Sequence, residues 1–179
     1  MADPLTLRLW VGRSSYLALA ILAIFVRLLP LGISPGDIPA PDLLLGATMA
    51  WVLRRPDQVP PLLIAGVFLT ADMIFLRPPG LWTLLVLAAA EFLRARQSLV
   101  RELPLMLEWL MVSVLLLGAV LVESLVLSVF VVPRVALGVA LLHMLVTLLA
   151  YPAVVAALWL VFGLRHTAPG EVDELGRRL

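Results

Sequence analysis

Charged side chains inside long apolar segments are the groups with which this sequence could do chemistry. Four of them interrupt such segments: Arg27, Asp72, Glu91 and Glu123. A carboxylate in such a place can relay protons, pair with a cation or bind a divalent ion with its neighbours. The acidic residues occur one per apolar segment, so they form neither a series along one helix, as a proton pump suggests, nor a clustered metal site.

The remaining catalytic possibilities are weak. The two histidines, His143 and His166, are far apart and lack the spacing of metal ligands. The chain has no cysteine, which excludes thiolate metal sites, disulfides and cysteine nucleophiles. No serine lies in a nucleophile-elbow pattern, and no glycine-rich phosphate loop follows a strand pattern. We therefore expect no enzyme activity, no cofactor and no metal ion.

The composition predicts an integral membrane protein. Of the 179 residues, 63% are hydrophobic and 14% charged, and the mean hydropathy is +1.09. Soluble domains are about half apolar and about a quarter charged. A water-soluble fold of this length could not bury so much apolar surface, so we expect a single domain in a lipid bilayer.

Proline, glycine and arginine divide the chain into six apolar segments, which we interpret as six transmembrane helices in an all-α bundle. They are 15–33, 41–53, 59–76, 80–93, 105–130 and 134–164. The second and fourth are short for a bilayer whose hydrocarbon core is about 30 Å thick. We expect an N-terminal segment over residues 1–14, which is either an interfacial helix with Trp10 as an anchor or an ordinary flanking turn. A membrane domain over 15–164 and a cytoplasmic tail over 165–179 should follow.

The arginines predict the orientation of the bundle. If all six segments cross, ten arginines share one side and only Arg77 and Arg134 face the other, while Arg27 lies within the first segment. The ten are Arg8, Arg13, Arg54, Arg55, Arg94, Arg96, Arg101, Arg165, Arg177 and Arg178. Cytoplasmic loops carry the excess of positive charge, so both termini are predicted to be cytoplasmic.

This orientation places Arg27, Asp72 and Glu123 at a similar depth in the outward half of the bundle. An ion pair of Arg27 with Asp72 or Glu123 would remove most of the cost of inserting these charges and would fix the helix register. Two alternatives stay open: a polar cluster that opens outward or receives a partner helix, and snorkelling of the charges to the interface. We expect Glu91 to pair with Arg94 or Arg55.

A second acidic residue, Glu108, lies near Trp109 at the start of the fifth segment. We expect Glu108 to be an interface residue.

Several short motifs resemble, in order and spacing, the rod shape-determining MreD family. They are Pro41-Asp42-Leu43-Leu44-Leu45, Trp51, Arg55-Pro56, the Gly66-Val67-Phe68-Leu69 segment with Asp72, Arg77-Pro78-Pro79-Gly80 and Tyr151-Pro152. The resemblance covers most of residues 40–165. It departs before Asp72, where many members carry a glycine; here Ala71 precedes Asp72, and Gly66 lies six residues before it.

The resemblance implies a six-helix bundle similar to the substrate-binding subunit of energy-coupling-factor transporters. It implies a non-catalytic scaffold of the cell-wall elongation machinery in the bacterial inner membrane. The implied partners are an MreC-like single-pass protein and, through it, MreB filaments, RodA and a class B penicillin-binding transpeptidase, with no nucleic acid. The candidate buried polar or partner-contact residues are Arg27, Asp42, Asp72, Glu91 and Glu123.

Two other functions remain as hypotheses. A substrate-binding subunit of a small-molecule transporter would share the helix count, and Arg27, Asp72 and Glu123 could line its outward pocket. Such pockets use several convergent polar groups, and this sequence offers few. A membrane enzyme acting on lipid-linked substrates would need clustered acidic residues, which are absent.

Overall fold

The computed structural model describes residues 4–29, 39–97, 104–133 and 135–164. Within these ranges the protein is entirely helical, with six α-helices and one short 3-10 helix. They are α1 (Pro4–Leu28), α2 (Leu43–Arg54), η1 (Pro56–Gln58), α3 (Pro61–Ile74), α4 (Leu81–Ala95), α6 (Leu105–Val129) and α7 (Leu137–Phe162). Each apolar segment expected from the sequence overlaps one α-helix, although α1 begins 11 residues before its segment and α2 and α4 end one and two residues after theirs. By length and composition, α1, α6 and α7 are long and apolar enough to cross a membrane.

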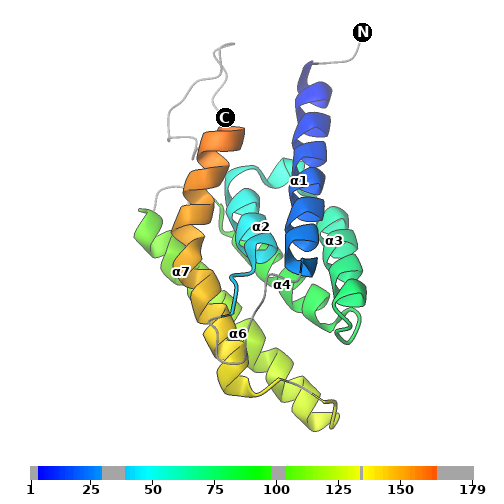
Figure 1. The fold of residues 1–179 in the computed structure, drawn as a ribbon. Helices are drawn as coiled ribbons and strands as arrows, with labels where there is room; N and C mark the ends of the chain where they lie inside the picture. Colours follow the sequence, from blue (N-terminus) through cyan, green and yellow to red (C-terminus); the bar gives the residue numbers. More distant parts are fainter. Residues whose placement is uncertain (1–3, 30–38, 98–103, 134, 165–179) are drawn as a thin grey trace.

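Helix α2 forms the centre of the bundle and packs against α1, α4 and α7 (Figure 1). Of its 12 residues, only Leu43 is not buried. A helix that is hydrophobic on all sides needs cover on all sides, which explains why this short segment lies inside the ring of the others. Core side chains of the other helices, among them Tyr16 of α1 and Phe68 of α3, pack around it.

Helix α1 differs from the expected division at residue 14, because it runs without a break from Pro4 to Leu28. Gly12 does not interrupt it. A Cβ atom there would overlap Cδ of Gln58, so Gly12 allows α1 to approach η1 closely. The Gln58 side chain in turn accepts a hydrogen bond from Nε1 of Trp51 at 3.0 Å. The glycine therefore serves helix packing.

Helix α7 continues through Pro152 because another helix supplies the hydrogen bond that proline cannot make. Pro152 has no N–H to donate to the carbonyl of Leu148, one turn earlier. Nε1 of Trp109, on α6, donates to that carbonyl at 2.7 Å. An unpaired carbonyl inside an apolar bundle is costly, so this contact both satisfies α7 and joins it to α6.

This contact generates a prediction about stability. Trp109→Phe should lower the free energy of unfolding by about 1–3 kcal/mol, because it leaves the Leu148 carbonyl unpaired. In a Pro152→Ala background the same change should cost much less, because the backbone N–H of the introduced alanine can donate to that carbonyl. Thermal unfolding of the four proteins in detergent measures the difference. Equal losses in both backgrounds would show that the indole matters only for its volume.

Candidate functional site

Two groups of polar side chains lie near opposite ends of the bundle, one buried and one partly exposed. The first, which we call the inner cluster, consists of Arg54, Glu108 and Tyr151, from α2, α6 and α7. Nη1 and Nη2 of Arg54 donate to the two carboxylate oxygens of Glu108 at 2.9 and 3.2 Å. The Tyr151 hydroxyl donates to Oε1 of Glu108 at 2.6 Å. The bidentate geometry and the third donor neutralise a carboxylate that is 0% exposed.

The prediction that Glu108 is an interface residue was therefore wrong. Glu108 occupies the first turn of α6 and Arg54 the last turn of α2, so each seemed from the sequence to sit at the edge of its apolar segment. The packing of α4 and α7 around α2 encloses both. A signal that could have indicated this cluster is Tyr151, a hydroxyl-bearing side chain next to a proline in a mostly apolar helix.

The second group lies near the other end of the bundle, and we call it the outer charged layer. It comprises Arg27, Asp42, Asp72, Arg77, Glu123 and His143. Nη1 of Arg27 contacts Oδ2 of Asp42 at 2.6 Å, and its guanidinium stacks on Phe75 at 4.7 Å from the ring centre. The expectation that Arg27 pairs with Asp72 or Glu123 was wrong, because Asp42 at the start of α2 lies next to the end of α1.

Asp42 joins three helices. Its Oδ1 accepts the backbone N–H of Leu45 at 3.0 Å and so caps α2, while Oδ2 binds Arg27 of α1. Its own backbone N–H donates to Oγ1 of Thr147 on α7 at 2.9 Å. A carboxylate at a helix N-terminus satisfies an unpaired N–H and interacts favourably with the helix dipole. This makes Asp42 the anchor of the central helix at its outer end.

Asp72 explains why an apolar helix carries a carboxylate shortly before its end: it caps the next helix. Its Oδ2 accepts from the backbone N–H groups of Gly80 and Thr83, both at 3.2 Å, and from the Thr83 hydroxyl at 2.7 Å. Gly80 precedes α4 with a φ of +90°, which favours glycine. Asp72 is 1% exposed, and its Oδ1 has no hydrogen-bond partner among the described residues.

Arg77, Glu123 and His143 complete the outer charged layer through longer-range electrostatics. Glu123 on α6 interacts with the charges of Arg77 and Asp72. His143 on α7 hydrogen-bonds to the backbone of Ala40 and interacts with the charges of Arg27, Asp42 and Arg77.

Arg77 lies in the turn between α3 and α4, where its guanidinium stacks on Phe75 and Trp82. Burial lowers its pKa from the ordinary value of arginine, and the positive charge of Arg27 acts in the same direction. The carboxylates of Asp42, Glu123 and Asp72 oppose this shift. The structure thus gathers these charged residues into one layer at one end of the bundle.

Glu91 lies apart from both groups. It pairs with Arg94 one turn later, at 3.1 Å between Oε1 and Nε, which confirms one of its two expected partners. The two atoms are within ion-pair distance but not in hydrogen-bond geometry. Arg94 also donates to the backbone carbonyls of Pro56 and Val59, at 3.1 and 2.7 Å, and so attaches α4 to the segment that follows α2.

No protein-family description, curated protein or solved structure matches this chain. Within the described ranges, no group of three or more histidine, cysteine or acidic side chains could hold a metal ion. The described part of the chain is all-helical, with three helices long and apolar enough to cross a membrane, and it holds two groups of charged and polar side chains, of which the inner cluster is buried.

The inner cluster yields a prediction about charge burial. Glu108→Ala should destabilise the protein by about 3–5 kcal/mol, because it leaves the Arg54 guanidinium buried without its counter-ion. A triple variant that also removes the other polar groups, Arg54→Met with Glu108→Leu and Tyr151→Phe, should recover most of this loss. Thermal unfolding in detergent compares the three proteins. A wild-type midpoint for Glu108→Ala would contradict the buried pairing.

The cap on α4 yields a second prediction from this site. Asp72→Ala removes the acceptor for three hydrogen bonds and should cost about 1–3 kcal/mol of stability. Asp72→Asn retains an oxygen that can accept them and should lose a smaller part. The unfolding midpoints of the two variants measure this difference. If alanine and asparagine destabilise equally, the negative charge and not the cap is what the bundle requires.

Proposed function

We propose that this chain is a non-catalytic, six-span membrane scaffold of the MreD type in the cell-wall elongation machinery. The observation that carries the proposal is the position in the fold of the residues that resemble the MreD family. Asp42 joins α1, α2 and α7; Asp72 joins α3 to α4; and the Tyr151-Pro152 pair joins α7 to α6 through Glu108 and Trp109. The motifs are thus the contacts by which the bundle is held together, as expected of a shared architecture.

The direction of the helices supports six crossings. Successive helices run in alternate directions, so their ends lie near the outer charged layer and near the inner cluster in turn (Figure 1). We propose that the end with Arg54 and Arg94 is cytoplasmic, because the predicted loops at that end carry the excess of arginine. Both termini then face the cytoplasm of the bacterial inner membrane.

The use of the buried carboxylates supports a non-catalytic role. Glu108 is bound by Arg54 and Tyr151, Asp42 by Arg27, and Asp72 by Thr83 and Gly80. A general base or nucleophile must reach a substrate, whereas these groups are buried within helix contacts. We propose that their purpose is to fix the relative positions of the helices.

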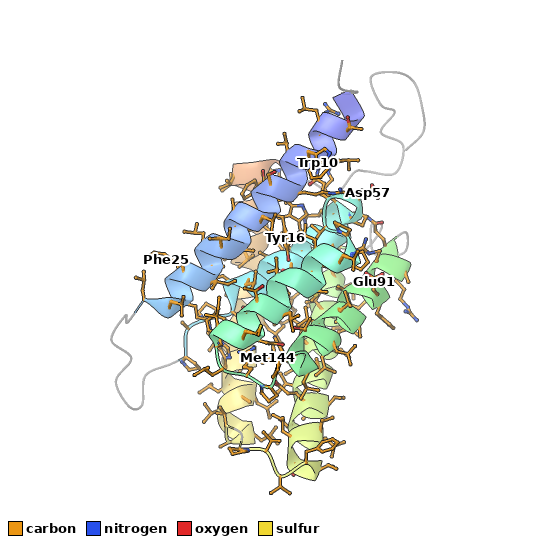
Figure 2. All side chains as sticks on the ribbon, turned by 90° about the vertical axis from the view of Figure 1, so that its right-hand side faces the viewer. Trp10, Tyr16, Phe25, Asp57, Glu91 and Met144 are labelled. Carbon is orange, nitrogen blue, oxygen red and sulfur yellow. The ribbon has the colours of Figure 1, made fainter. Side chains whose placement is uncertain are left out.

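The exposed apolar faces support a role in binding other membrane helices. Helix α1 is the least enclosed of the three long helices, with 17% of its most apolar window buried. Its Phe25 points away from the bundle in Figure 2. We propose an MreC-like single-pass protein as the direct partner, with MreB filaments, RodA and a class B penicillin-binding transpeptidase connected through it.

The gathering of charges in the outer charged layer favours a second candidate, the substrate-binding subunit of a small-molecule transporter. A groove in the described part of the chain, beside the inner cluster, has a volume of about 300 Å³ and is lined by Leu105, Met106, Trp109 and Pro152. Its lining is apolar and lacks the convergent polar groups of a specific ligand site. The two candidates differ in what should accompany the purified protein.

The scaffold proposal predicts a co-purifying partner. An affinity-tagged chain solubilised from its native membranes should retain a single-span membrane protein, identified by mass spectrometry of the eluate. Glu108→Ala, which should destabilise the bundle, is the comparison variant and should retain less of this partner. Recovery of a stable monomer alone, from cells that express both proteins, would contradict the scaffold. A retained small molecule would instead favour the transport subunit.

A further inference from the structure

Helices α6 and α7 extend past the outer charged layer, whereas the other helices end at it. Six residues separate Glu123 from the end of α6 at Val129, and six separate the start of α7 at Leu137 from His143. At 1.5 Å per residue, the hairpin therefore projects by about 9 Å. Figures 1 and 2 both show its tip beyond the ends of α1, α3 and α4.

This projecting part, residues 124–142, which we call the overhang, is apolar in sequence except for Ser124, Ser128 and Arg134. Its described residues include no charged side chain. Large hydrophobic side chains are exposed on it: Leu125, Val129, Phe130, Val131, Val135, Leu137, Val139 and Leu142. A surface of this kind is stable in hydrocarbon and unfavourable in water.

The opposite side of the bundle is short. Helices α3 and α4 have 14 and 15 residues, and they face outward with exposed apolar side chains such as Leu62, Met73 and Leu84. At 1.5 Å per residue they rise about 21–22 Å, well below the roughly 30 Å of a hydrocarbon core. Their outer ends meet at the turn that carries Leu76 and Arg77.

No flat bilayer surface suits both sides. A surface at the tip of the overhang would place the outer charged layer about 9 Å inside hydrocarbon, although the Arg27 side chain is 33% exposed. A surface at the outer charged layer would leave the overhang in water. Bending the leaflet costs only a small amount for each ångström of mismatch, so it is the least costly of the three arrangements.

We infer that the protein dents the outer leaflet, with lipid tails covering the overhang and with water and headgroups descending to the outer charged layer beside α1, α3 and α4. The partner of this surface is the bilayer itself, and short acyl chains fit it best. The inference requires only that the bundle crosses the membrane with this geometry. It does not depend on the scaffold function, and it holds for the transport alternative as well.

With a flat bilayer surface, the position further out on the bundle would be at least as exposed to water as the other. A dented leaflet predicts the opposite order at two positions, and this can be measured. Leu76, 92% exposed, lies in the α3–α4 turn, and Leu125, 64% exposed, lies two residues further out than Glu123 on α6. The chain has no native cysteine, so Leu76→Cys and Leu125→Cys can each carry a single spin label. The protein is reconstituted alone into dioleoylphosphatidylcholine vesicles, and label collisions with a water-soluble nickel chelate and with oxygen are measured.

The expected result is that the label at 76 meets the nickel chelate and the label at 125 meets mainly oxygen. Labels that both meet the chelate would place the surface at the outer charged layer, and labels that both avoid it would place the surface at the tip; either outcome overturns the dent. Val114→Cys, exposed in the middle of α6, is the hydrocarbon reference. If either primary variant fails to fold, Ile74→Cys and Val129→Cys form a second pair with the same expected order.

Acyl chain length provides an independent readout on the unmodified protein. The unfolding midpoint in vesicles should fall as monounsaturated chains lengthen from 16 to 22 carbons, because a thicker leaflet needs a deeper dent. A midpoint that rises over this series would show that the bilayer thickness matches the length of α6 and α7 and not that of α3 and α4. This result would overturn the inference.

Discussion

Helix α2 can be central only because the charges at its two ends are neutralised inside the protein. At one end Arg54 is held by Glu108 of α6, and at the other Asp42 is held by Arg27 of α1 and Thr147 of α7. Between them every residue except Leu43 is buried. Without these partners, a guanidinium and a carboxylate would remain in an apolar interior, where an isolated charge is very unfavourable. The positions of α1, α6 and α7 around α2 follow from this constraint.

The same constraint governs the other helix ends. Asp42 and Asp72 each use one carboxylate both to satisfy backbone N–H groups and to hold a second helix. Trp109 does the equivalent at the break in hydrogen bonding that Pro152 causes. In a bundle with little polar surface, these polar groups thus also serve as contacts between helices, which makes the fold specific without a large number of polar residues.

The helices were predictable from the sequence, because hydropathy and proline, glycine and arginine breaks are local properties. So was the pairing of Glu91 with Arg94, which lie one turn apart on α4. The partner of Arg27 was not predictable, because Asp42 lies at the start of the next helix and its distance from Arg27 depends on how α1 and α2 pack. The inner cluster was missed because Arg54 and Glu108 are 54 positions apart and each adjoins a polar stretch. Only the folded arrangement brings the two ends together.

Helix α1 touches the rest of the bundle along one narrow stripe, formed by Gly12, Tyr16 and Ala20 at four-residue intervals. Gly12 abuts Gln58, Tyr16 bonds to Thr48 at 3.0 Å, and Arg27 closes the row on Asp42. These contacts along the length of α1 fix its rotation about its own axis and its position along the bundle. Its opposite side, which is exposed and apolar, is therefore presented to neighbouring molecules in one orientation relative to the rest of the bundle.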